Sequence, residues 1–394
     1  MKSPLEGVKV VDVSRYLAGP YCTMMLGDMG AEVIKIERPG SGDESRQFAP
    51  FWNGESCFFL SVNRNKKSLT LDIKKPAGRE IFLELVRGAD VLVENFRPGV
   101  TRKLGIDYAT LARENPRLIY CSMTGYGSVG PAKDRPAFDL LVQADAGLMS
   151  ITGIPDGPPV KTGTSVLDLA CGTNAVAGIL AALLMRERTG RGQLIETSLF
   201  EAQIAWLNYH AVGYFATGRV PSRLGSAHPS VAPYQAFKTQ DGYLVVAIGH
   251  DRAWATFCSA LQRTDLVEDQ RFRTNPLRVQ NREALVEELE STLTTRTTAE
   301  WLDILTPLGI PCAPINTVDR VLSSRQAADL GMVPSLPHPK VPDLKVCGFP
   351  IHMSEGTEPT WSPPPLLGQH TEEILASLGK TPAEIARLRR EGVI

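Results

Sequence analysis

Short β-branched runs alternate with longer helical patterns along the first 125 residues, and this alternation limits the possible folds more than any other feature. The runs that read as buried strands are residues 8–13 (VKVVDV), 32–37 (EVIKIE), 68–73 (SLTLDI), 90–96 (DVLVENF) and 118–125 (LIYCSMTG). Helical patterns separate them, including residues 76–89, where Pro76 stands in the first turn. Strands and helices alternating at this spacing predict an α/β fold with a parallel, doubly wound sheet.

The character of the sequence changes after residue 205. The signals there are a Gly-, Pro- and Ser-rich stretch at 211–237, an Asp241-Gly242 hairpin pair, leucines at every fourth position (Leu285, Leu289, Leu293) and a capping box between Thr297 and Glu300. Strand and helix signals are mixed without a regular β-α order. They predict a second, smaller α+β domain over residues 206–325.

Composition excludes several classes of protein. Lys plus Arg number 42 against 43 Asp plus Glu, so the chain lacks the basic excess of a nucleic-acid binder. Seven scattered cysteines without a CxxC pair are typical of reduced thiols in the cytoplasm. The N-terminal residues lack an apolar signal core, and the longest apolar stretch, 175–185, is too short to span a bilayer. We therefore expect a cytoplasmic protein without nucleic-acid or membrane partners.

Familiar catalytic motifs are absent from the sequence. The turn after the first strand lacks GxGxxG, and neither GxxxxGK[ST] nor GxSxG occurs. The first histidine is His210, so a histidine triad or a zinc site confined to the first half is excluded. We expect no metal site.

Basic residues gather instead near the ends of the predicted strands. They are Arg38 and Arg46 after the second strand, Arg64, Lys66, Lys67, Lys74 and Lys75 around the third, and Arg97 and Lys103 after the fourth, beside Asn95. A basic cluster alone is most often a solvated face. Three clusters at strand ends in one half of the chain favour a phosphorylated ligand, on whose ring Phe96 or Tyr16 could stack.

Asp168 stands in front of a long run of small and apolar residues, 169–185. The residues alone leave two interpretations open. Asp168 either caps a helix or reacts in a site.

The motifs together resemble the class III CoA-transferases, the family of formyl-CoA transferase and the carnitine CoA-transferase. The stretches that carry the resemblance are VVDVSRYLAGPYC, GAEVIKIERPGSGDESR, NRNKKSLTLDIKKPAGR, ADVLVENFRPGV, GYGSVGP, ERTGRGQ and PPPLLGQHTEEIL. The resemblance implies a large Rossmann-like CoA-binding domain over 1–205, completed by 326–394, and a small domain over 206–325. It also implies an interlocked homodimer that uses coenzyme A thioesters as substrates and carries no prosthetic group.

The resemblance also implies roles for single residues. Asp168 falls on the family's nucleophile, which would attack an acyl-CoA thioester and form an anhydride and then a thioester. The position at a helix N-terminus favours the anion that attacks. The residues on family CoA-contact positions are Tyr16, Leu17, Ala18, Arg38, Leu71, Lys74, Asn95, Phe96, Arg97 and Lys103. Lys103 replaces an arginine, which keeps the charge but loses the bidentate fork.

Two departures bear on the reaction and its substrates. Phe138 stands where the related α-methylacyl-CoA racemases carry a histidine, and a phenyl ring cannot act as a base. Residues 219–235 replace a longer glycine-rich insertion of formyl-CoA transferase, which argues against the smallest acids.

The substrates expected are succinyl-CoA and a small dicarboxylate. Itaconate is the first choice, followed by mesaconate, citramalate or malate. Oxalate and an aromatic or carnitine-like acid remain alternatives. A free carboxylate on the acyl group needs a cation, for which Arg46, Arg135, Arg223 and His228 are candidates.

Overall fold

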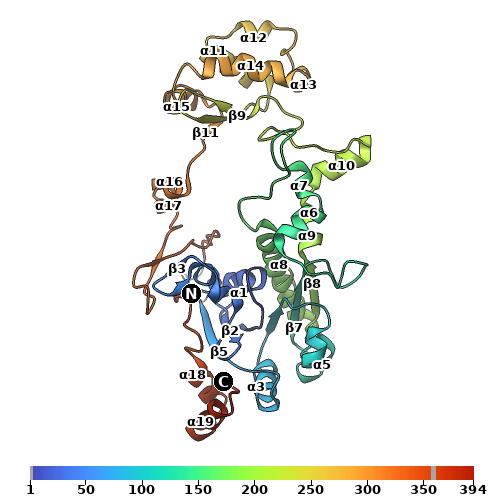
Figure 1. Ribbon diagram of the computed structural model, residues 1–394, viewed down its shortest axis with the longest axis vertical. Helices are drawn as coiled ribbons and strands as arrows, with labels where there is room; N and C mark the ends of the chain where they lie inside the picture. The colour runs from blue at the N-terminus through green and yellow to red at the C-terminus, as the bar shows by residue number, and fades with distance from the viewer. Residues whose placement is uncertain (1–2, 356–360) are drawn as a thin grey trace. The chain divides into compact units, whose positions relative to one another are not determined.

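A computed structural model of the chain describes residues 3–355 and 361–394 and contains two compact units (Figure 1). The larger unit comprises Met1–Gly147, Thr162–Ala211 and Arg325–Ile394, and the smaller unit comprises Leu148–Lys161 and Val212–Ser324. Both ends of the chain belong to the larger unit. The segment Leu148–Lys161, which we expected within 1–205, belongs to the smaller unit.

Six parallel strands form the sheet of the larger unit. They are β1 (Lys9–Asp12), β2 (Glu32–Glu37), β5 (Lys66–Thr70), β6 (Val91–Glu94), β7 (Ile119–Thr124) and β8 (Leu194–Ser198), in the order β5-β2-β1-β6-β7-β8. The parallel α/β sheet is confirmed, and β8 is a strand that the sequence analysis missed. The strand order reverses between β1 and β6, the point at which open α/β sheets bind ligands.

Alternate side chains of the central strands belong to two separate apolar clusters, one on each face of the sheet. Val10 of β1 and Val91 of β6 pack with helices α1 (Ala18–Asp28) and α8 (Val166–Thr189). Val11 and Leu92, the next residues along, pack with α3 (Pro76–Arg87) and with the C-terminal helices α18 (Thr371–Ser377) and α19 (Pro382–Arg390). Near-continuous apolar strands therefore follow from burial on both faces.

The C-terminal segment is joined to the strand β5 by backbone and side-chain hydrogen bonds. The His370 N–H donates to the Ser68 carbonyl at 3.0 Å, and the Thr70 N–H donates to the Thr371 hydroxyl at 3.1 Å. These bonds satisfy the outer edge of the sheet with residues about three hundred positions away in the sequence.

Helix α8 is long and apolar enough to cross a membrane by length and composition, contrary to our expectation from residues 175–185. Core helices of globular proteins pass the same test. Cys171, Ala175 and Ile179 of α8 are fully buried in the cluster that includes α1. At Gly172 a Cβ atom would lie 2.7 Å from the carbonyl oxygen of Ala18, so α8 and α1 pack with their backbones close together.

The smaller unit contains an antiparallel sheet of β9 (Tyr234–Lys238), β10 (Tyr243–Ala247) and β11 (Cys312–Pro314). The hairpin turn at Asp241-Gly242 joins β9 to β10, as predicted. Leu285, Leu289 and Leu293 are the buried face of α14 (Arg282–Leu293). Thr297 and Glu300 form the predicted capping box of α15 (Thr298–Leu305).

Shorter elements complete the described chain. They are β3 (Phe51–Trp52), β4 (Glu55–Ser56), α2 (Cys57–Ser61), α4 (Val100–Leu104), α5 (Tyr108–Glu114), α6 (Asp139–Asp145), α7 (Leu148–Ile151), α9 (Leu199–Trp206), α10 (Asn208–Thr217), α11 (Asp251–Ala260), α12 (Asp265–Glu268), α13 (Asn275–Gln280), α16 (Val318–Leu322), α17 (Arg325–Asp329), β12 (Ser335–Leu336) and β13 (Leu344–Lys345), with 3₁₀ turns at Glu44–Gln47 and Thr306–Leu308.

Candidate active site

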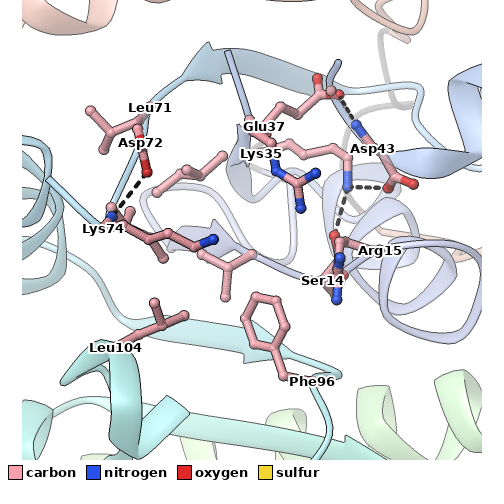
Figure 2. A pocket seen from close by; sticks show the side chains of 15 residues that line it. Ser14, Arg15, Lys35, Glu37, Asp43, Leu71, Asp72, Lys74, Phe96 and Leu104 are labelled. Atoms are coloured by element: carbon pink, nitrogen blue, oxygen red, sulfur yellow. Dashed lines mark hydrogen bonds and ion pairs between the residues drawn. The ribbon is translucent and has the colours of Figure 1, made fainter. Parts of the chain in front are cut away.

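Two pockets of the larger unit open beside the point where the strand order reverses. The first, which we call the β2 pocket, has a volume of about 110 Å³ and is lined by residues of the loops after β1, β2 and β5 (Figure 2). The second, the Asp168 pocket, has a volume of about 370 Å³ and is lined by the loops after β1, β6 and β7 and by Asp168 itself. Arg15 and Phe96 line both, so the two pockets are neighbours along one surface.

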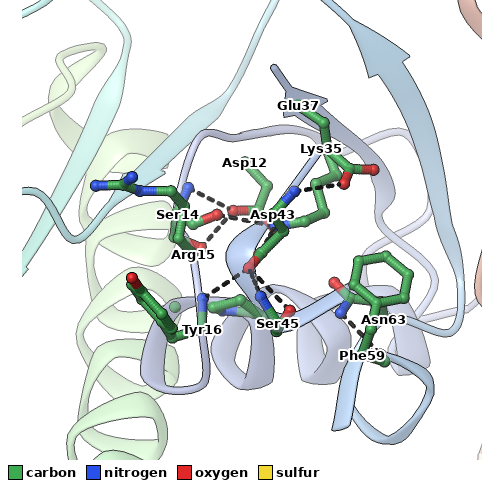
Figure 3. Close-up of polar contacts among 12 residues, drawn as sticks. Asp12, Ser14, Arg15, Tyr16, Lys35, Glu37, Asp43, Ser45, Phe59 and Asn63 are labelled. Atoms are coloured by element: carbon green, nitrogen blue, oxygen red, sulfur yellow. Dashed lines mark hydrogen bonds and ion pairs between the residues drawn. The ribbon is translucent and has the colours of Figure 1, made fainter. Parts of the chain in front are cut away.

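Buried charges hold the loop between β1 and α1, from which both pockets are built. The backbone N–H and hydroxyl of Ser14 donate to the Asp12 carboxylate, and Lys35 Nζ donates to the Ser14 carbonyl at 2.8 Å (Figure 3). Lys35 also pairs with Asp43 at 2.9 Å, and Lys66 pairs with Asp12 at 3.1 Å. All four charged side chains are almost completely buried. Removing one partner would leave an uncompensated buried charge, so this arrangement fixes the loop rigidly.

The pKa values of this network follow from burial and pairing. Burial raises the pKa of Asp12, but Lys35, Lys66 and the neighbouring hydroxyl groups outweigh it and lower the pKa to about 2. Burial lowers the pKa of Lys66 to about 8, only partly offset by Asp12. Lys66, which we expected among the cations that bind a ligand, is instead buried and paired with Asp12, so that expectation was wrong.

The next two residues of the loop are also fixed, by side chains from other strands. Asn95 binds the backbone of Arg15 twice, accepting its N–H at 2.8 Å and donating to its carbonyl at 2.7 Å. The Tyr16 N–H donates to Asp43 at 3.2 Å, and Tyr16 adopts a left-handed backbone conformation with φ of 64°. The amide of Asn95, expected at a CoA contact, therefore positions the loop.

Arg15 is a site residue that the sequence analysis missed. Its guanidinium group lies 5.0 Å from the centre of the Phe96 ring and pairs with Glu44 at 2.6 Å. The Phe96 N–H donates to Glu94 at 2.8 Å, and burial raises the pKa of Glu94 to about 7. Arg15 and Phe96 thus form the shared wall of the two pockets.

Asp168 lies in the first turn of α8 but does not cap it. Ser165 occupies the N-cap position and makes no side-chain cap bond. Asp139, from the start of α6, accepts the Leu167 N–H at 2.8 Å instead. In the part of the chain that the structure describes, no hydrogen bond ends on the Asp168 carboxylate, which lines the pocket. The capping interpretation of Asp168 is therefore wrong.

The electrostatic environment of Asp168 differs from our expectation. Burial, followed by the negative charge of Asp139, raises the pKa of Asp168 to about 7. We expected the helix N-terminus to favour the anion. The Leu167 N–H, one of the amides at the N-terminus of α8, is bound to Asp139. Burial and like charge therefore dominate the pKa of Asp168.

Most of the predicted CoA contacts line the two pockets. Tyr16, Leu17, Ala18, Asn95, Phe96 and Arg97 line the Asp168 pocket, and Arg38, Leu71, Lys74 and Phe96 line the β2 pocket. Lys103, an exposed residue of α4, lines neither. The side chain of Phe138 lines the Asp168 pocket edge-on to the ring of Tyr16.

The four candidate cations for an acid lie in different surroundings. Arg46 lines neither pocket, because its guanidinium group binds Glu37 through two 2.7 Å hydrogen bonds. Arg135 lines the Asp168 pocket and pairs with Asp145 at 2.8 Å. Arg223 and His228 belong to the smaller unit.

Lys133 is a further cation of the Asp168 pocket that the sequence analysis did not single out. Among the ion pairs of the described residues, none involves Lys133. Its position beside Arg135 in the loop after β7 was the available signal.

Metal ligands are not gathered in the described residues. Across 3–355 and 361–394 no group of three or more His, Cys, Asp or Glu side chains could hold a metal ion. All seven cysteines lie in these ranges and are free.

Comparisons with known proteins agree with this architecture. The model of CoA-transferase family III matches residues 5–371. Succinyl-CoA:glutarate CoA-transferase of Mus musculus is 46% identical over 393 residues, which are 99% of this chain and 90% of the relative. Acetyl-CoA:oxalate CoA-transferase of Acetobacter aceti is 43% identical over 333 residues, 84% of this chain and 86% of the relative.

The solved structures give the same result. The crystal structure of a CAIB/BAIF family protein from Brucella suis has a TM-score of 0.86 and 39% sequence identity, and covers 96% of this chain and 100% of its own. The chain is a CoA-transferase and belongs to CoA-transferase family III.

Proposed function

We propose that this CoA-transferase moves CoA from succinyl-CoA to a C5 dicarboxylic acid through covalent intermediates on Asp168. The observation that carries the proposal is the position of Asp168. It is a carboxylate without a hydrogen-bond partner among the described residues, in a pocket that shares a wall with a second, cation-lined pocket. A carboxylate at such a place is available as a nucleophile.

The first half of the reaction transfers CoA onto the enzyme. An oxygen of the Asp168 carboxylate attacks the thioester carbonyl carbon, the C–S bond breaks, and the products are an acyl–Asp168 anhydride and CoA thiolate. The thiolate attacks the Asp168 carbonyl of the anhydride. This step forms an Asp168–CoA thioester and releases the donor acid as its carboxylate.

The second half repeats these steps in reverse. The carboxylate of the acceptor acid attacks the Asp168 thioester, which expels the thiolate and forms a new anhydride. The thiolate then attacks the acyl carbonyl of the acceptor, giving its CoA thioester and regenerating the Asp168 carboxylate. Atoms and charge balance without a further reactant.

The CoA molecule is proposed to extend from the β2 pocket to the Asp168 pocket. Arg38 and Lys74 supply positive charge at the β2 pocket for the phosphate groups of CoA. Lys103 of α4 is proposed to add a further positive charge for the same groups. The Phe96 ring offers a stacking surface at the shared wall. The thioester end would then lie beside Asp168.

Lys133 is proposed to bind the second carboxylate of the acid. An unpaired buried carboxylate is costly, so a dicarboxylate needs a cation whose charge is not already neutralised. Arg135 is paired with Asp145. Arg223 belongs to the smaller unit, where its guanidinium group is held by the carbonyl groups of Ile154 and Gly157. Lys133 lines the Asp168 pocket and makes no ion pair among the described residues, and Arg97, which shares both properties, is already proposed as a CoA contact.

The choice of a C5 acid draws on the relatives. The mouse relative is named for succinyl-CoA and glutarate, which supports testing glutarate ahead of itaconate, our expectation from the sequence. The Acetobacter aceti relative is named for acetyl-CoA and oxalate, so this pair is the second candidate.

The free thiols fit a cytoplasmic location.

A second copy of the chain is proposed to complete the enzyme. Helix α10 has no buried residue, yet it carries the exposed apolar side chains Val212, Tyr214 and Phe215. Several exposed large apolar side chains on one helix support a protein interface there. An interlocked homodimer would cover it.

Covalent trapping tests the role of Asp168. Hydroxylamine added during turnover with succinyl-CoA should convert Asp168 into a hydroxamate that peptide mass spectrometry locates. Asp168→Ala should lose about three orders of magnitude or more in turnover while still binding CoA, because the nucleophile is gone. Asp134→Ala, which removes an exposed acid of the loop after β7, is the matched control. Near-normal turnover of Asp168→Ala would refute the mechanism.

A further inference from the structure

The first turn of α8 is held from outside the helix. Asp139 is 6% exposed and accepts the Leu167 N–H at 2.8 Å, and Leu167 directly precedes Asp168. Ser165 contributes no cap bond. The direction of the Asp168 side chain therefore depends on a carboxylate in another helix, α6.

A chain of hydrogen bonds from Thr162 through Gln143 requires the side chain of residue 139 to accept hydrogen bonds with both oxygens. The Thr162 N–H donates to the Oε1 atom of Gln143 at 3.0 Å, which turns the Nε2 amide group of Gln143 toward the Oδ2 atom of Asp139. Both partners of Asp139, the Leu167 amide and Gln143, are donors. Only a side chain that accepts at both oxygens satisfies them, and an ionised carboxylate does so.

The same arrangement sets a negative charge beside Asp168. Four cations also line the pocket: Arg15 is paired with Glu44 and Arg135 with Asp145. Arg97 and Lys133 make no ion pair among the described residues, but neither is among the groups that shift the pKa of Asp168.

The other elements packed against α8 contribute little charge at this point. Helix α9 contributes Glu201, which accepts the Ser198 hydroxyl, and β8 contributes Glu196. Helix α1 and strand β7 contribute the buried thiols of Cys22 and Cys121, whose pKa values burial raises. The Cys171 thiol, one turn along α8 from Asp168, is also neutral at pH 7, because burial raises its pKa to about 12. Among the charged groups, Asp139 is the one that adds to burial in raising the pKa of Asp168.

We propose that Asp139 is the positioning residue of the nucleophile: its ionised carboxylate binds the Leu167 N–H, orients the first turn of α8 and places a negative charge beside Asp168. This rests on the proposed role of Asp168. A more basic carboxylate is a better nucleophile toward the thioester once ionised. The pKa of Asp168 is about 7, and protonated Asp168 does not attack. Activity should therefore fall on the acidic side of the pH profile already near neutral pH.

Two variants distinguish the hydrogen bond that Asp139 accepts from Leu167 from the negative charge that Asp139 places beside Asp168. Asp139→Asn alone sets an amide group against the amide group of Gln143, so it should lower both stability and turnover. Adding Gln143→Glu restores the network, because the new carboxylate accepts from the amide at 139 and from the Thr162 N–H. The double variant keeps the cap and moves the negative charge away from Asp168.

The double variant should fold with a thermal midpoint close to that of the wild type. Its acidic limb in kcat/KM should lie about 0.5–1 pH unit lower, and its plateau should be several-fold slower. Asp134→Asn, an exposed residue, should change neither. A double variant with the wild-type pH profile and plateau would reduce Asp139 to a structural cap and overturn the proposal.

Two further outcomes keep the proposals distinguishable. If hydroxylamine never modifies Asp168 in the wild type, the proposed function fails. If Asp168 is modified but the double variant keeps the wild-type profile, only the role of Asp139 fails. Should neither variant fold, the wild-type enzyme decides, because an acidic limb below pH 5 would contradict a charge acting on Asp168.

Discussion

Asp139 and Asp168 are two carboxylates in contact with the start of one helix, and their surroundings give them different tasks. Asp139 receives two hydrogen bonds from donors and is satisfied. Asp168 receives none among the described residues and faces a pocket. Sequence singled out Asp168 as cap or nucleophile but could not decide between them, because the residue that caps α8 lies 28 positions before the amide that it binds.

Lys133 provides the residue-scale test of acid selection. Lys133→Gln should raise KM for glutarate and itaconate roughly tenfold or more, since one charge-assisted hydrogen bond contributes about 1.5–3 kcal/mol. KM for butyrate should change little, because butyrate has no second carboxylate. Steady-state kinetics with product detection by mass spectrometry measure both.

Arg223→Ala and His228→Ala are the comparison variants, because the sequence analysis expected them to bind the acid. If KM for dicarboxylates rises more in these variants than in Lys133→Gln, then Arg223 or His228, and not Lys133, binds the second carboxylate. Better turnover with butyrate or acetate than with any dicarboxylate would contradict a dicarboxylate substrate altogether.

At the scale of elements, ion pairs between distant parts of the chain explain why some of the basic residues do not bind a ligand as we expected. Arg64 and Lys66 stand in a visibly basic stretch, but they pair with Asp28 and Asp12, which are 36 and 54 residues away. A local pattern cannot reveal such partners. Lys74, from the same stretch, does line a pocket.

The packing of α8 on α1 gives a prediction for these two elements. A methyl group at residue 172 would lie 2.7 Å from the Ala18 carbonyl oxygen and 3.1 Å from the Tyr21 ring, so the helices must separate. Gly172→Ala should cost about 1–3 kcal/mol of unfolding free energy. It should also raise KM for acyl-CoA, because Ala18 lines the Asp168 pocket.

Urea unfolding and steady-state kinetics check this prediction against Gly163→Ala. A methyl group at residue 163 would point into open space, and the backbone there is one that other residues adopt, so that variant should change stability by no more than about 0.5 kcal/mol. Equal stability of the two variants would show that α8 and α1 tolerate a wider spacing.

For the whole molecule, strong local patterns were sufficient for the class of fold. The predicted runs at 8–13, 32–37, 90–96 and 118–125 contain β1, β2, β6 and β7, because strands covered on both faces favour apolar sequence. The predicted strand 68–73 corresponds to β5, which runs from Lys66 to Thr70 and is less apolar. The strand β8 was missed because its sequence, LIETS, carries polar residues and its burial is incomplete. The assignment of Leu148–Lys161 to the smaller unit was missed because so short a segment does not differ recognisably in composition from its neighbours.

Assembly is the prediction that belongs to the whole molecule. Interlocked subunits cannot separate without unfolding, so loss of the dimer and loss of secondary structure should coincide as urea rises. Sedimentation velocity and circular dichroism on the same samples measure the two events. Phe215→Glu, which charges the most exposed aromatic side chain of α10, should lower the urea midpoint of both together, since a charge buried in an interface costs free energy. A folded monomer that appears on dilution would rule out the interlocked arrangement while leaving the chemistry of Asp168 untouched.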